Sequence, residues 1–169
     1  MGRWRPPREA GSPYITPAGY RALQDELEAI WPRRREVVAA LSAAAAEGDR
    51  SENAEYIYRK KELGGIDARI RYMQKRLPNL EIVRRTSSPE GVFFGAEVTL
   101  GISGAATARY RLVGEDEADP ASGNINIDSP LAKALMKKQV GDEVLLPTGS
   151  ESATARIEAI SYELDAEDK

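Results

Sequence analysis

Four acidic residues lie close together in the sequence, between two long segments of helical periodicity: Glu47, Asp49, Glu52 and Glu55. Asp49 and Glu52 are three positions apart, which places both carboxylates on one side of a helix start. Clustered carboxylates repel one another unless a cation joins them. The spacing therefore allows Asp49 and Glu52 to face one metal ion together.

The same stretch has a second interpretation, as the start of a helix. Gly48 is suited to end the first helical segment with a positive φ. Asp49 is a good N-cap for the next helix, and Glu52 would then occupy the N3 position of a capping box. In this interpretation the two acids only begin a helix. The pattern alone leaves both interpretations open.

The sequence contains no histidine and no cysteine, which removes several kinds of chemistry. Zinc sites built from Cys and His, Ser-His-Asp triads, disulfides and thiol nucleophiles are excluded. Any hydrolytic chemistry must use carboxylates, a metal ion or groups supplied by a partner. The 169 residues are 30% charged with a net charge of −3, which is typical of soluble globular proteins. Without a long apolar run or a signal peptide, we expect a cytoplasmic protein that does not contact membranes.

The helical segments around the acids predict how the acids are positioned. Residues 1–13 combine arginines with prolines and predict a disordered arm. Residues 14–83 predict an antiparallel coiled-coil hairpin, in which Thr16-Pro17 begins the first helix and Pro32 kinks it. Apolar residues recur there at heptad spacing. They are Tyr20, Leu23, Leu27, Ile30, Val37 and Leu41 before the tip, and Tyr56, Leu63, Ile66, Ile70, Met73, Leu77 and Leu80 after it.

The second helical segment also carries a row of basic residues, which we name the basic strip: Arg59, Lys60, Lys61, Arg69, Arg71, Lys75 and Arg76. One interpretation is a solvated face that is partly paired with Glu62 and Asp67. The other is a strip that follows the phosphate backbone of RNA or DNA.

After a linker at residues 84–91, the apolar period changes from helical to two. Val92, Phe94, Ala96, Val98 and Leu100 predict one strand, and Ser129-Pro130 predicts a helix start. Further strands are expected around Tyr110 and Leu112, Ile125 and Ile127, Val144 to Leu146, and Ala155 to Leu164. Residues 92–169 therefore predict a small antiparallel sheet with one helix against it, which makes the chain α+β.

Four stretches resemble the Gre family of bacterial transcript cleavage factors, and they occur in family order within residues 14–163. They are ITPAGYRALQDEL, GDRSENAEY, VFFGAEV and INIDSPLAKALMKKQVGDEV. Arg50-Ser51 and Phe93-Phe94 are similar to the B-type branch of that family. The resemblance implies an N-terminal coiled coil and a C-terminal domain like that of FK506-binding proteins.

The resemblance also implies a function. Such a factor docks on bacterial RNA polymerase and inserts its coiled coil into the secondary channel. We expect the chain itself to be a monomer. It is not an enzyme itself: it stimulates the polymerase to cut backtracked nascent RNA. Asp49 and Glu52 would be the catalytic acids, and they would hold a Mg²⁺ ion shared with the polymerase.

Other residues receive roles from the same resemblance. Arg59, Lys60 and Lys61 would bind the RNA 3′ end, and Ser51 and Asn53 are candidates for orienting water or RNA. Docking on the polymerase would fall to a set at the helix start of the C-terminal domain, namely Asp128, Ser129, Pro130 and Lys133.

Two alternatives remain at this point. One is a regulator that occupies the polymerase channel and inhibits it without promoting cleavage. Such a protein is expected to lack a productive acid pair. The other is a peptidyl-prolyl isomerase or chaperone, suggested only by the class of the C-terminal fold, and fold does not imply function.

Overall fold

The computed structural model describes residues 11–48, 52–103, 106–147 and 153–165. The chain divides into two compact units. The hairpin unit is Ala18–Leu80, and the sheet unit combines Met1–Pro17 with Glu81–Lys169. None of the described helices has both the length and the apolar character that a bilayer-spanning segment needs.

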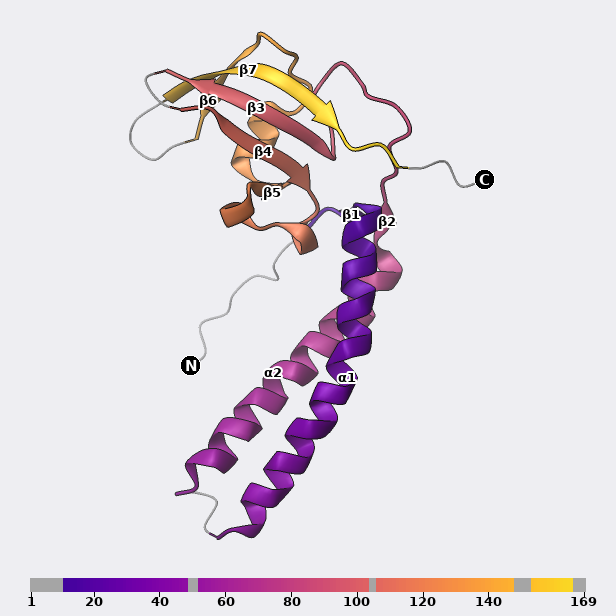
Figure 1. The fold of residues 1–169 in the computed structure, drawn as a ribbon, viewed down its shortest axis with the longest axis vertical. Helices are drawn as coiled ribbons and strands as arrows, with labels where there is room; N and C mark the ends of the chain where they lie inside the picture. The colour runs from indigo at the N-terminus through magenta and orange to yellow at the C-terminus, as the bar shows by residue number, and fades with distance from the viewer. Residues whose placement is uncertain (1–10, 49–51, 104–105, 148–152, 166–169) are drawn as a thin grey trace, which may run out of the picture. The chain divides into compact units, whose positions relative to one another are not determined.

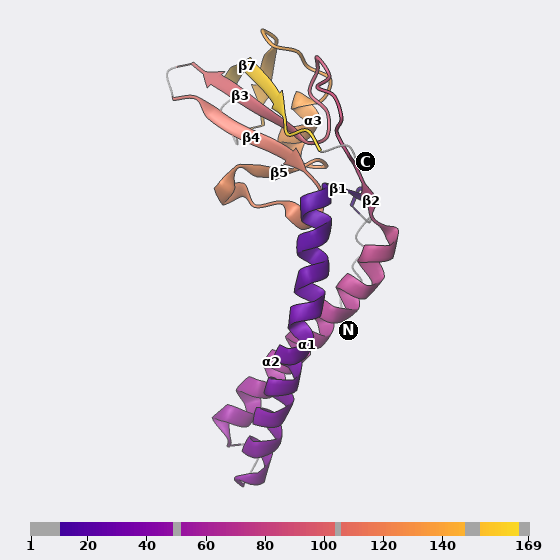
Figure 2. The same cartoon turned by 45° about the vertical axis from the view of Figure 1, so that its right-hand side comes forward.

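The hairpin unit consists of two long helices that run antiparallel and side by side (Figures 1 and 2). They are α1 (Pro17–Ala46) and α2 (Ala54–Arg76), and a 3₁₀ turn (Leu77–Asn79) follows α2. Every residue of the predicted heptad seam is buried or half-buried. The buried seam residues come from both helices: Leu23 and Val37 on α1, and Ile70 and Met73 on α2. Ala44 of α1, outside the predicted seam, is buried as well. The heptad prediction is confirmed, because that spacing keeps one stripe of each helix facing the other.

Ion pairs flank this seam. Arg34 lies at a seam position itself, and its Nε donates to Asp67 Oδ1 at 2.7 Å across the two helices. Arg69 makes a two-bond contact with Glu26, at 2.6 and 2.7 Å. The hydrogen bond from Arg69 lowers the pKa of Glu26. The helix α1 continues through Pro32 without ending.

The sheet unit contains a five-stranded sheet in the order β5-β4-β3-β7-β6. Its strands are β3 (Ala96–Ile102), β4 (Ala108–Val113), β5 (Asn124–Asn126), β6 (Glu143–Leu146) and β7 (Ala153–Tyr162). Neighbouring strands are antiparallel except for β4 and β5, which are parallel. The prediction of a purely antiparallel sheet is wrong at this pair. The chain between them runs through two 3₁₀ turns (Glu115–Glu117 and Pro120–Ser122), and this longer connection returns β5 in the direction of β4.

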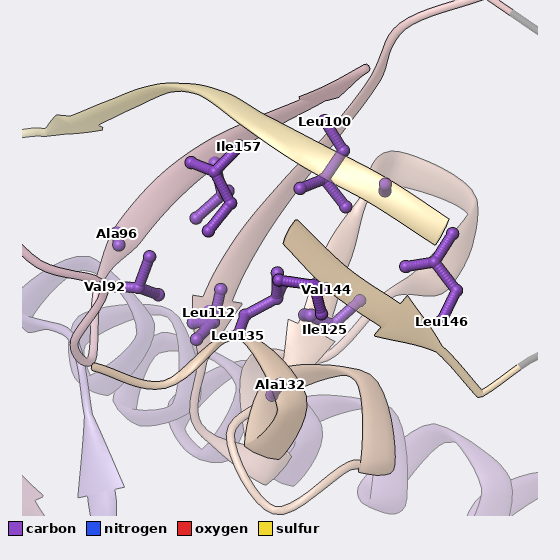
Figure 3. Packing of buried hydrophobic residues seen from close by; sticks show 12 residues of the cluster. Val92, Ala96, Leu100, Leu112, Ile125, Ala132, Leu135, Val144, Leu146 and Ile157 are labelled. Carbon is purple, nitrogen blue, oxygen red and sulfur yellow. The ribbon is translucent and has the colours of Figure 1, made fainter. Parts of the chain in front are cut away.

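The core of the sheet unit lies between the sheet and the helix α3 (Pro130–Leu135), whose Ala132 and Leu135 are fully buried. Figure 3 shows both residues in one cluster with Val144 and with the strand residues Leu112 and Ile125. The helix begins where the sequence predicted it. Ser129 is its N-cap and accepts a hydrogen bond from the Ala132 N–H at 3.2 Å.

The predicted first strand of this unit differs from the observed one. The strand β3 begins only at Ala96, because Gly95 has a φ of 85° and interrupts the extended backbone. Val92 and Phe94 precede the strand but are still buried. The alternation of apolar residues therefore predicted the buried residues correctly, although Val92 and Phe94 do not belong to the strand.

A second, smaller sheet was not predicted. The strands β1 (Tyr14–Ile15) and β2 (Glu81–Ile82) pair in parallel. The next residue, Thr16, donates to the carboxylate of Glu117 from its backbone N–H at 3.0 Å and also from its hydroxyl. Glu117 thereby binds the segment that precedes α1 to the loop after β4.

Candidate functional site

The second helix of the hairpin is capped by Asn53, and this corrects the predicted helix start. Asn53 has extended backbone angles, and its side-chain oxygen accepts a hydrogen bond from the Tyr56 N–H at 3.0 Å. Its amide nitrogen donates to the Ala44 carbonyl at 2.7 Å, so one side chain joins the end of α1 to the start of α2. A capping box with Asp49 at the N-cap and Glu52 at N3 is wrong, because α2 begins four residues later than that arrangement requires.

Of the two candidate metal ligands, only Glu52 lies within the described residues. Asp49 lies outside the described residues, as does the candidate Ser51. Glu52 precedes the cap and is exposed. Its carboxylate has no hydrogen bond or ion pair within the described part of the chain. Glu52 is thus free of the helix-capping role, and its charge is available to a cation.

Of the other described tip acids, Glu55 is paired and Glu47 is not. Glu55 accepts a hydrogen bond from Arg59 Nε at 2.7 Å, one turn along α2. Glu47 is exposed, and its backbone N–H bonds to the Ala44 carbonyl at 3.2 Å. Gly48 has the predicted positive φ, at 136°. Among its described members, the charge cluster expected at the tip is therefore neutralised only at Glu55, and the carboxylates of Glu47 and Glu52 have no partner in the described part of the chain.

Arg59 belongs to an ion-pair network rather than to an open basic surface. Besides Glu55, it donates to Glu62 at 3.0 Å. Glu62 also accepts from Arg33 of α1, which in turn contacts Glu36 at 3.3 Å. The bonds to Glu55 and Glu62 raise the pKa of Arg59. Partial desolvation acts to raise the pKa of Glu62, but the hydrogen bonds from Arg33 and Arg59 outweigh it and lower that pKa.

Lys60 and Lys61 present a contrast with Arg59. Both are exposed, and no ion pair in the described ranges involves either of them. The interpretation of the basic strip as a phosphate-binding surface stays a prediction for these lysines. Arg59 is paired within the hairpin, as the solvated-face interpretation expects, and the two lysines carry charge that is left for a ligand.

The predicted docking residues gather at the start of α3. Asp128 is half-buried, and its carboxylate accepts two hydrogen bonds from Ser12, from the backbone N–H at 2.7 Å and from the hydroxyl. The Asp128 N–H donates to the Asn126 side chain at 2.9 Å. Asp128 therefore holds the segment that leads into β1, a role that the sequence did not suggest.

The remaining docking candidates follow on the same helix. Ser129 has its hydroxyl engaged as the cap of α3. Pro130 and Lys133 are exposed and three positions apart, so they share one face of the helix. All four docking candidates lie within the six residues from Asp128 to Lys133 at the start of α3, and their docking role stays a prediction.

Comparison with known protein families accounts for both units. Residues 13–82 match the model of the transcription elongation factor N-terminal domain of GreA and GreB. Residues 87–162 match the model of the C-terminal domain of the same factors. The chain belongs to the GreA/GreB family. The relationship implied by the four sequence stretches is thereby confirmed.

Individual members of the GreA/GreB family match this chain over most of its length. Transcription elongation factor GreB of Xanthomonas axonopodis is 56% identical over 88% of this chain and 92% of its own. GreB of Pseudomonas aeruginosa is 54% identical over 88% of this chain and 89% of its own. Among solved structures, the GreA factor homolog Gfh1 of Thermus thermophilus is 27% identical, covers 88% of this chain and 97% of its own, and has a TM-score of 0.41. The family assignment depends on the sequence matches.

Several contacts of this GreA/GreB family member could not be found from its sequence. The bond from Asn53 to Ala44 and the bonds from Ser12 to Asp128 join residues that no local motif connects. One signal was present: asparagine is among the best N-cap residues, and Asn53 directly precedes a segment of helical periodicity. With Asn53 as the cap, neither Asp49 nor Glu52 is needed to start α2.

Proposed function

We propose that this chain stimulates bacterial RNA polymerase to cut backtracked nascent RNA, with Asp49 and Glu52 at the hairpin tip as the acids that assist cleavage. The observation that carries the proposal is the exposed carboxylate of Glu52, which neither caps α2 nor pairs with a described cation. Relatives named transcription elongation factor GreB support polymerase as the partner. The long hairpin gives the tip a reach of about 45 Å along α1, at 1.5 Å per residue.

The donor set at the tip suits Mg²⁺, although it is incomplete by itself. Mg²⁺ favours oxygen ligands and retains water, so Asp49 and Glu52 would hold it only together with groups of the polymerase. When bound, a second metal ion helps to activate water and to stabilise the leaving oxygen of a phosphodiester. The chain's own contribution would be to present these two carboxylates beside the start of α2, a helix that Asn53 caps. The described residues contain no group of three or more acids that could hold a metal without the polymerase.

A stalled, backtracked polymerase complex with labelled RNA tests this function. Adding the chain with Mg²⁺ should shorten the RNA, and the chain alone should cut none, because two carboxylates do not make a two-metal site. Binding without shortening would instead favour a regulator that occupies the channel without promoting cleavage. Activity on a proline-containing peptide would favour the isomerase alternative.

Docking is expected to depend on Asp128. Replacing Asp128 with Lys should weaken binding to polymerase by more than about tenfold, because like charges placed together at an interface cost several kcal/mol. The measurement is competition against the labelled wild-type chain. The Ser12→Ala variant is the matched control, since it removes one bond to Asp128 and leaves its charge. Equal losses in both variants would mean that Asp128 acts by holding the Ser12 segment, and unchanged affinity in Asp128→Lys would exclude a docking role.

The lysines of the basic strip should determine the salt dependence of RNA binding. Replacing Lys60 and Lys61 with Ala should reduce the slope of log K against log salt by about 1.4, because each lysine that neutralises a phosphate of a single strand adds about 0.7 to that slope. The slope is measured on backtracked complexes and on complexes without extruded RNA, and the difference reports the RNA. Arg59→Ala is the control: its charge is already paired with Glu55 and Glu62, so it should change stability rather than slope. If the slope is unchanged in the double lysine variant, the basic strip does not bind RNA phosphates and is only a solvated face.

A further inference from the structure

We propose that the first two turns of α2 form a stacking site for a base of single-stranded RNA, built from the ring of Tyr58 with Ile57 and Lys61 beside it. The inference rests on the proposed function, since it concerns the same extruded RNA. It adds a base contact to the phosphate contacts expected of the lysines. The residues that carry it were not among the candidates that the sequence suggested, apart from Lys61.

Two large apolar side chains lie open to solvent at this place. Tyr58 is 59% exposed and Ile57 is 53% exposed, whereas the neighbouring seam residues Tyr56 and Leu63 are half-buried. Lys61 is four positions after Ile57 and three after Tyr58, so its side chain neighbours each of theirs on the helix surface. Ile57 and Tyr58 are thus not part of the contact with α1, and the hairpin does not need them for its own packing.

The ring of Tyr58 is held in place from one side. The guanidinium carbon of Arg59 lies 5.4 Å from the centre of the ring, within the range of a cation–π interaction. The same guanidinium donates to Glu55 at 2.7 Å and to Glu62 at 3.0 Å, so its own position is fixed. A ring restrained before the ligand arrives loses less conformational freedom on binding. Arg59 is therefore a positioning residue, which acts on the ligand through Tyr58.

The chemistry of this surface favours a nucleic acid strand over an apolar protein segment. Every base offers a flat face that stacks on an aromatic ring, and such stacking tolerates any sequence. Lys60 and Lys61 are exposed without a described carboxylate partner, and they supply the charge that a phosphate backbone requires. Tyr58 lies about 6 Å along the axis from Ala54, the first residue of α2. A strand whose scissile bond lies at the tip would pass this ring.

The experiment separates stacking from cleavage. A backtracked complex is prepared with 2-aminopurine near the RNA 3′ end and mixed with the full chain carrying Asp49→Asn and Glu52→Gln, so that the RNA stays intact. The fluorescence should be quenched, and the additional change Tyr58→Leu should remove the quench. Tyr58→Phe keeps the ring and should retain it. With the acids intact, Tyr58→Leu should slow RNA cleavage about tenfold, the effect expected when one base no longer stacks.

Tyr72 is the matched control, because it is also an exposed tyrosine of α2 with a guanidinium, that of Arg69, 5.4 Å from its ring. Tyr72→Leu should change neither quench nor cleavage. The inference is overturned if Tyr58→Leu keeps the quench, or if it weakens binding equally to complexes without extruded RNA, which would indicate a protein occupant. If the wild-type chain shortens no RNA but the quench depends on residue 58, the proposed function fails and the stacking site stands. If the wild-type chain shortens the RNA but the quench does not depend on residue 58, the proposed function stands and the stacking site fails.

Discussion

Replacing Asp49 with Asn and Glu52 with Gln should remove stimulated RNA cleavage and leave the stability of the hairpin unchanged. Glu52 lies before the helix and outside its cap, since Asn53 caps α2. Its amide variant therefore touches no contact that holds the described tip together. Surface substitutions of this kind change the free energy of unfolding by less than about 0.5 kcal/mol. A neutral amide is a poor ligand for Mg²⁺, so the cleavage rate should fall by about 100-fold or more.

The measurement is the single-turnover cleavage rate of a backtracked complex saturated with the variant, together with a binding competition. Binding to polymerase should persist, and raising the Mg²⁺ concentration should partly restore each single variant. Glu47→Gln is the matched control, because it also removes one exposed charge beside the tip. It should retain nearly all cleavage. A double amide variant that still cleaves at the wild-type rate would falsify the assignment of the tip acids.

The hairpin and most of its seam could be predicted because they depend on spacing alone. Heptad positions face the partner helix whatever the rest of the chain does, and Val37 and Met73 are buried as that rule requires. The helix α3 was predicted for a similar local reason, since Ser129-Pro130 is a strong start signal. Each of these depends on residues within a few turns of one another.

The features that the sequence did not predict depend on contacts between separate segments of the chain. The capping interpretation placed Asp49 at the N-cap of α2. The observed cap is Asn53, which gains a second bond to Ala44, nine residues earlier and on another helix. The parallel pairing of β5 with β4 depends on the path of a long connection, which alternation of apolar residues does not reveal. The bond from Ser12 to Asp128, between residues 116 positions apart, was not predicted, and the docking role of Asp128 stays a prediction. Contacts between distant segments decided all three.

Replacing Asn53 should separate the stability of the hairpin tip from its chemistry. The side chain has two bonds, one to the Tyr56 N–H at 3.0 Å and one to the Ala44 carbonyl at 2.7 Å. Asn53→Ala loses both, which should lower the free energy of unfolding of the hairpin by about 2 kcal/mol, with about 1 from the cap and about 1 from the second bond. Asn53→Asp still caps α2 but has no proton to donate to Ala44. It should therefore lose about 1 kcal/mol.

The expected order of stability is therefore wild type, then Asn53→Asp, then Asn53→Ala. Urea unfolding followed by circular dichroism measures this order. Amide hydrogen exchange at Tyr56 reports the cap directly. The exchange of that amide should rise in Asn53→Ala and change little in Asn53→Asp. Cleavage should fall in step with stability, because a loosened tip no longer holds Glu52 in one place, and binding to polymerase should change little. If Asn53→Ala keeps its stability but loses cleavage, Asn53 contacts the RNA or its attacking water directly. Equal stability of Asn53→Asp and the wild type would instead show that the bond to Ala44 contributes nothing to the hairpin.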